Sequence, residues 1–142
     1  MSAAADFVAG ARALKGARWR HRGRKPWAVD CVGLVVLAAR NKNLQVLDAK
    51  GYGREPWEDR LRRELRERMG DPVPEPWEPG DIALIRWKGV GQPSHVAVIG
   101  DRPGGLTLIH AHNLHGVVEC SMAGVYRDIV IEVYRPRWNR VD

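Results

Sequence analysis

Hydrophobic and polar positions follow a helical pattern in the first third of the chain. Apolar residues three and four apart over Ala3–Leu14 predict an amphipathic helix, and Gly16 follows as a natural stop. A second helix is predicted from Asp30, a good N-cap residue, because the stretch from Val32 to Ala39 is apolar almost all round. This second helix should be buried at the centre of the protein.

The middle of the chain is more polar. The basic segment Ala17–Val29 contains Gly23 and Pro26 and predicts an irregular loop. Over Glu55–Met69 a narrow apolar stripe among alternating charges predicts a surface helix. The residues of this stripe, four apart, are Trp57, Leu61, Leu65 and Met69. The proline-rich stretch 71–80 forbids regular structure and predicts a connector within one domain.

After Gly80 the pattern changes to short runs typical of strands, separated by Gly or Pro turns. The predicted strands are Ile82–Trp87, His95–Ile99, Leu106–His112, Val117–Met122 and Ile129–Tyr134. Helices followed by antiparallel strands predict an α+β fold. A length of 142 residues fits a single domain over residues 1–142.

Composition narrows the classes of function. No apolar run approaches the roughly 18 residues that span a bilayer, so we expect no membrane insertion. Residues Met1–Gly16 do not have the pattern of a secretory signal, which predicts synthesis in the cytoplasm. The net charge of +6 is concentrated near the N-terminus, where a solvated basic face is favoured over a nucleic-acid partner. Cys31 and Cys120 are expected to be free thiols.

Cys31 is the candidate nucleophile. It directly follows Asp30 at the start of the predicted central helix, where backbone N–H groups and the helix dipole stabilise a thiolate. A buried structural cysteine is the alternative interpretation. Because thiol chemistry needs a base within hydrogen-bond reach, the hypothesis depends on a partner.

His95 is the candidate base, since it opens a strand directly after Ser94 and a histidine at a strand's edge can point into a cleft. His110 and His112 share one face of the next strand, and either could orient the base. His110 is expected to lie beside His95 if the two strands pair. A zinc site built from Cys31 and these three histidines is the alternative, although no close paired-ligand spacing beyond His-x-His supports it.

Taken together, the motifs resemble the NlpC family of cell-wall cysteine peptidases. The motifs, in the family's order across roughly residues 5–135, are Gly16–Gly23, Asp30-Cys31-Val32-Gly33-Leu34-Val35, Pro79–Ile82, Ser94-His95-Val96-Ala97-Val98 and Ile109-His110-Ala111. The resemblance implies a papain-like fold in which the catalytic cysteine's helix packs against the antiparallel sheet. It also implies cleavage of peptide bonds in peptidoglycan stem peptides, without a cofactor or metal. Carried over to this chain, Cys31 is the nucleophile, His95 the base and His110 the residue that orients it.

The chain departs from the family pattern at two positions near the cysteine. Val32 stands where the family usually has serine. Trp19 stands where the family usually has a tyrosine whose hydroxyl faces the active site, so any help from that hydroxyl must come from another group, such as His21. His21 otherwise reads as a solvated loop residue. Asp30, Trp19, His21, Val32, Ser94 and His112 are therefore the candidate supporting residues.

The segment Arg18–Arg24 resembles the branch of the family encoded with phage tails and gene-transfer particles. That resemblance implies a place in a virion or particle tail, contacts with tail-tip or baseplate proteins, and action on the periplasmic cell wall. Two rival interpretations are a structural tail component of the same fold with little activity and a papain-like acyltransferase. The bond cleaved, the oligomeric state and the role of Cys120 are left open by the sequence.

Overall fold

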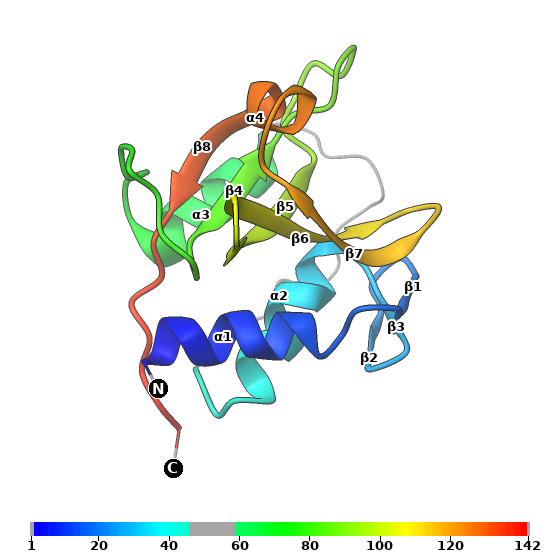
Figure 1. Cartoon of the computed structure of the whole chain (residues 1–142), viewed down its shortest axis with the longest axis vertical. Helices are drawn as coiled ribbons and strands as arrows, with labels where there is room; N and C mark the ends of the chain where they lie inside the picture. The colour runs from blue at the N-terminus through cyan, green and yellow to red at the C-terminus, as the bar shows by residue number, and fades with distance from the viewer. Residues whose placement is uncertain (1, 46–58, 142) are drawn as a thin grey trace.

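The computed structural model describes residues 2–45 and 59–141. Four helices and eight strands are present in this part of the chain, with the helices mostly first and the long strands last. The predicted α+β class is confirmed. The helices α1 (Ala3–Arg12) and α2 (Cys31–Arg40) lie on one side of an antiparallel sheet (Figure 1).

The five strands of this sheet are arranged in the order β7-β6-β5-β4-β8. Their bounds are β4 (Ile82–Ile85), β5 (His95–Arg102), β6 (Gly105–His112), β7 (Gly116–Ser121) and β8 (Val130–Tyr134). All neighbouring strands pair antiparallel. The five predicted strands are therefore confirmed, although β4 ends before Trp87 and β5 continues three residues beyond Ile99.

Side-chain alternation gives the sheet two buried faces. Val96, Val98 and Ile109 belong to the cluster that packs with α1 and α2, whereas Ala97 and Leu108 belong to a second cluster on the opposite face. His95 and His110 are in step with Ala97 and Leu108, respectively. The histidine side chains therefore belong to the face opposite α2.

The central helix α2 is as buried as predicted. Leu34, Val36 and Ala38 are at most 1% exposed. Full burial of a Val or Leu side chain contributes about 1.5–3 kcal/mol, so this helix is a major source of stability. Its packing against α1 is close, because a Cβ added at Gly10 would lie 2.3 Å from the carbonyl oxygen of Ala38.

The prediction of an irregular loop over Ala17–Val29 is wrong. This segment forms a small sheet of the two-residue strands β1 (Arg18–Trp19), β2 (Arg24–Lys25) and β3 (Ala28–Val29), in the order β1-β3-β2. Strands of two residues have no visible alternation, and β1 pairs in parallel with the more distant β3. Such non-local pairing leaves no periodic signal in the sequence.

The remaining elements lie around the second half of the chain. Helix α3 (Arg60–Met69) confirms the C-terminal part of the predicted surface helix, while residues 55–58 of that prediction lie outside the described residues. The short helix α4 (Val125–Ile129) was not predicted. The C-terminal segment packs against α1, since the ring centroids of Phe7 and Trp138 lie 4.5 Å apart. None of the helices in the described ranges has the length and hydropathy required to cross a bilayer.

Candidate active site

Asp30 holds the start of α2, as its place in the sequence predicts. Its buried carboxylate accepts a hydrogen bond from the Gly33 N–H at 2.8 Å, the usual N-cap interaction. It also accepts the Arg22 N–H at 2.8 Å and faces Arg24 Nη1 at 3.2 Å. One carboxylate thus connects the first turn of the helix, which carries Cys31, to the small sheet.

Gly33 allows this connection to be close. A Cβ added at Gly33 would lie 2.0 Å from the carbonyl oxygen of Gly23. The glycine of the Asp-Cys-x-Gly-Leu motif therefore has a steric role, because any side chain would push the small sheet away from the cysteine.

Cys31 is a half-buried free thiol at the first position of α2. Burial, and next the negative charge of Asp30, raise the pKa of the thiol to about 12, against the lowering effect of hydrogen bonds from the backbone N–H groups of Val96, Val32 and Cys31. The expected thiolate is therefore not the resting form. At the start of this helix, desolvation and the N-cap carboxylate outweigh the backbone N–H groups.

His95 and His110 form a buried pair on adjacent strands. His95 Nε2 lies 2.9 Å from His110 Nδ1, with the ring planes nearly perpendicular at 84°. Burial lowers the pKa of His95 to about 3 and that of His110 to about 4, with a further contribution to His95 from His110 and to both from His112. Both rings are neutral near pH 7.

The backbone of β5 contacts Cys31 at Val96, the residue that follows His95. Ile99 donates its N–H to Asp81 on the β4 side, so the Val96 N–H, three residues away, points toward the β6 side. The ladder between β5 and β6 begins only at the pair Val98–Ile109. Beyond that pair, the Cys31 sulfur accepts a hydrogen bond from the Val96 N–H. The sulfur thus lies against the residue that follows His95, where the two strands separate.

Three further side chains surround the histidine pair and were not found by sequence reasoning. The ring centroids of Trp87 and His95 lie 5.1 Å apart, and those of Tyr126 and His110 lie 5.7 Å apart. Cys120 sulfur lies 3.8 Å from His110 Nε2. Only the strand register could have revealed Cys120, since it pairs with Leu108, two residues before His110 on the same face.

The predicted supporting residues have different positions. His112 is not the partner of His95: its Nδ1 accepts the N–H groups of Leu114 and His115 at 3.0 and 3.3 Å and so closes the turn between β6 and β7. Trp19 stacks with His21 at 6.4 Å, on a strand that pairs with the one leading to Cys31. Ser94 donates its backbone N–H to Ile85 at the start of β5.

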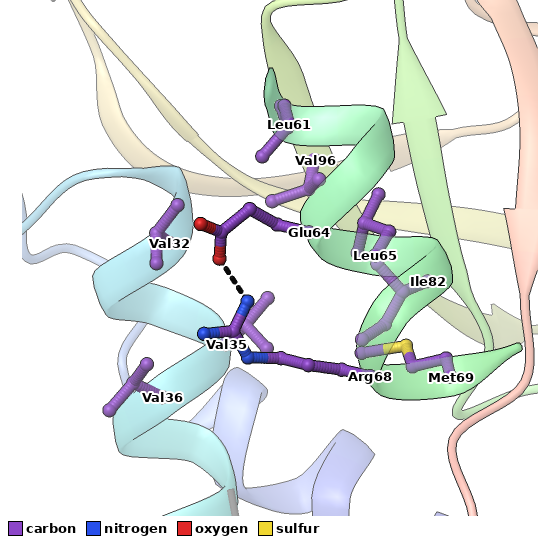
Figure 2. Close-up of a pocket in the computed structure, with 10 residues that line it drawn as sticks. All are labelled: Val32, Val35, Val36, Leu61, Glu64, Leu65, Arg68, Met69, Ile82 and Val96. Carbon is purple, nitrogen blue, oxygen red and sulfur yellow. Dashed lines mark hydrogen bonds and ion pairs between the residues drawn. The ribbon is translucent and has the colours of Figure 1, made fainter. Parts of the chain in front are cut away.

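Val32 has a packing role in the structure. It lines a cavity of about 60 Å³ between α2 and α3, with Val35, Val36, Leu65 and Val96 among the other lining residues (Figure 2). The Glu64–Arg68 ion pair lies at the edge of this cavity. The cavity is mainly apolar, which gives a reason for valine at the position where the resemblance leads one to expect serine.

The charge of the N-terminal segment is partly neutralised. Arg12 Nη2 lies 2.9 Å from the Glu119 carboxylate, and Arg24 pairs with Asp30.

The zinc alternative finds no support in residues 2–45 and 59–141, where no group of three or more His, Cys, Asp or Glu side chains is arranged to hold a metal ion.

Comparison with solved structures identifies the fold. The chain is similar to an NlpC/P60 family protein from Bacillus cereus, with a TM-score of 0.69 and 17% identity over 96% of this chain and 41% of that one. It is similar to the NlpC/p60 domain of the peptidoglycan hydrolase SagA, with a TM-score of 0.59 and 21% identity over 92% of this chain and 97% of that domain. It is also similar to an N-acetylmuramoyl-L-alanine amidase from Bacteroides uniformis, with a TM-score of 0.57 and 14% identity over 95% and 99% of the two chains.

The protein therefore has the NlpC/P60 fold, as the sequence motifs predict. It spans 41% of the length of the Bacillus cereus protein. No protein-family model matches the sequence, and no curated protein matches it.

Proposed function

We propose that this protein is an NlpC-type cysteine peptidase that hydrolyses peptide bonds in peptidoglycan stem peptides. Cys31 is the nucleophile, His95 the base and His110 the residue that orients the base. The observation that carries the proposal is the 2.9 Å contact between His95 Nε2 and His110 Nδ1. It leaves His95 Nδ1 for the thiol that lies against the next residue, Val96.

The protonation states define how the reaction starts. Because the pKa of Cys31 is raised to about 12 and that of His95 is lowered to about 3, the resting pair is a neutral thiol and a neutral imidazole. His95 Nδ1 takes the thiol proton as the sulfur attacks the scissile carbonyl carbon. His95 therefore acts as a general base in the transition state rather than as half of a preformed ion pair.

The later steps use the same groups. The imidazolium gives its proton to the leaving amine, and His95 then activates a water molecule that hydrolyses the thioester. We assign stabilisation of the oxyanion to backbone N–H groups at the start of α2, a type of interaction worth about 3–4 kcal/mol. These steps need no metal or organic cofactor.

The test is digestion of purified peptidoglycan by the full chain, with products identified by liquid chromatography and mass spectrometry. We expect peptide fragments with new amino and carboxyl ends, and no release by Cys31→Ala with an unchanged melting temperature. Absence of release by the unaltered protein, or equal release by Cys31→Ala, would contradict the proposal.

Amidase activity is a second candidate, because one of the similar structures is an N-acetylmuramoyl-L-alanine amidase. Cys31 would then attack the amide bond that joins muramic acid to the first alanine, with His95 and His110 in the same roles. The products distinguish the two reactions: an amidase releases intact stem peptides, whereas an endopeptidase cuts within them.

We also propose that the enzyme acts from the tail of a phage-like particle, with tail-tip or baseplate proteins as its neighbours. The support is the resemblance of Arg18–Arg24 to the branch of the family encoded with such tails. Mass spectrometry of purified particles should detect the chain in stoichiometric amounts. Its absence from intact particles would exclude this location without affecting the hydrolase proposal.

A further inference from the structure

Cys120 takes part in a chain of hydrogen bonds that leads to the candidate base. Its sulfur lies 3.8 Å from His110 Nε2 and 3.8 Å from the carbonyl oxygen of Leu108, both within the range of sulfur hydrogen bonds. The Tyr126 hydroxyl also donates a hydrogen bond to this sulfur. Cys120 thus touches the ring nitrogen of His110 that His95 leaves unused.

The neutral forms of these groups restrict the direction of the hydrogen bonds. Burial is the largest cause that raises the pKa of the Cys120 thiol, and burial lowers the pKa of His110 to about 4. Near pH 7 there is therefore one S–H and one ring N–H to place. The Leu108 carbonyl can only accept, so the hydrogen bond between it and the thiol must be donated by the S–H.

One arrangement then satisfies every group. The Cys120 S–H donates to Leu108, His110 Nε2–H donates to the sulfur, and His95 Nε2–H donates to His110 Nδ1. His95 Nδ1 is left unprotonated, as a base that faces Cys31 must be. If the S–H instead pointed to His110, both rings would take the other tautomer, and His95 Nδ1 could not accept the thiol proton.

We propose that Cys120 is a positioning residue that holds His110 in the Nε2–H tautomer and so keeps His95 ready to act as the base. This inference rests on the proposed function of Cys31 and His95. The preferred arrangement has one hydrogen bond more than its alternative, which shifts a tautomer equilibrium by about tenfold. Cys120 acts on the base through its contact with His110 and is therefore a positioning residue rather than a catalytic one.

Two variants of the full chain test the proposal. Cys120→Val removes the donor and acceptor and keeps a similar size, whereas Cys120→Ser keeps both and serves as the matched control. Nitrogen-15 NMR of the histidine rings should show the Nε2–H tautomer of His110 in the unaltered protein and in Cys120→Ser, and a mixture in Cys120→Val. On peptidoglycan, Cys120→Val should lower kcat by about twofold with an unchanged KM, because only about half of the molecules would then have the competent tautomer, and Cys120→Ser should recover most of the loss.

Other outcomes overturn the proposal. A His110 tautomer that is the Nδ1–H form, or that is unchanged in Cys120→Val, contradicts it. So does a loss of kcat that Cys120→Ser shares and that follows the melting temperature, because Cys120 would then act by packing alone. If the unaltered protein does not cleave peptidoglycan, the proposed function fails, while the NMR comparison still decides whether Cys120 controls the tautomer of His110.

Discussion

His95 Nε2 lies 2.9 Å from His110 Nδ1, although the two residues do not stand opposite each other in the sheet. The register of β5 and β6 pairs Val98 with Ile109, and its continuation would place His110 opposite Ala97. The His95 ring therefore reaches His110 diagonally, beyond the last ladder pair. This contact uses one ring nitrogen of His95, and in the proposed mechanism the other nitrogen serves Cys31.

Loss of the His110 ring should remove the acceptor that orients His95. We expect His110→Ala to lower kcat by about a hundredfold. A loss of this size is typical when a general base is no longer held in place. His110→Asn keeps an amide oxygen for His95 Nε2–H and should retain more activity. Steady-state kinetics on peptidoglycan fragments measure both variants, and equal kcat values for the two would show that the hydrogen bond does not matter.

The reactivity of Cys31 toward iodoacetamide should rise with pH and show no plateau near neutrality. The reason is its raised pKa of about 12, which leaves little thiolate at pH 7. Peptide-resolved mass spectrometry separates the alkylation of Cys31 from that of Cys120. A rate that is already constant between pH 6 and 8 would reveal a thiolate–imidazolium pair and contradict the neutral resting state.

Substitution Asp30→Asn should make Cys31 more reactive. The amide oxygen still accepts the Gly33 N–H, but the negative charge that helps to raise the pKa of Cys31 is gone. Each unit by which the pKa falls increases the thiolate fraction about tenfold at pH 8. The matched control is Asp30→Ala, which also removes the cap and should lower the free energy of unfolding by about 1–2 kcal/mol. Slower alkylation in Asp30→Asn would contradict the electrostatic account.

Gly33→Ala should destabilise the protein, although alanine is the better helix former. The added Cβ would lie 2.0 Å from the Gly23 carbonyl oxygen, so backbone must move, at a cost of about 1–3 kcal/mol. Gly91→Ala is the matched control, because its Cβ meets no atom within 4 Å. Chemical denaturation compares the two. A Gly33→Ala protein as stable as Gly91→Ala would show that the small sheet can shift without cost.

The free energy of unfolding should decrease as the pH falls from about 6.5 toward 3. The pKa of His95 is about 3 in the folded protein and 6.5 in the unfolded chain, so the unfolded chain binds more protons in this range. Glu119 acts in the same direction below pH 4.5, because Arg12 holds its pKa near 2. Urea denaturation between pH 3 and 8 measures the slope. Glu119→Gln should flatten the part below pH 4.5, and an unchanged slope there would contradict the role of this carboxylate.

Local pattern was sufficient for the elements that have a clear period. Helix α1 and the five strands of the main sheet were predicted because apolar residues recur at helix or strand spacing over several turns or pairs, and α2 was predicted from its N-cap residue and its continuous apolar run. The segment Ala17–Val29 was wrongly predicted as a loop, since its strands are two residues long and are held by pairing with one another. The short helix α4 has no buried residue and so no apolar stripe to reveal it.

For the candidate site, the sequence by itself determined which residues have suitable chemistry and which of them are close in the chain. Asp30 caps the helix of Cys31, and His95 and His110 lie on strands that a short turn joins, so their proximity follows from local structure. Only the tertiary structure decided that His110, rather than His112, contacts His95, because this depends on strand register and on where the ladder ends. It also decided the protonation states, since burial by residues distant in the chain, which no local pattern records, raises the pKa of Cys31 and lowers that of His95.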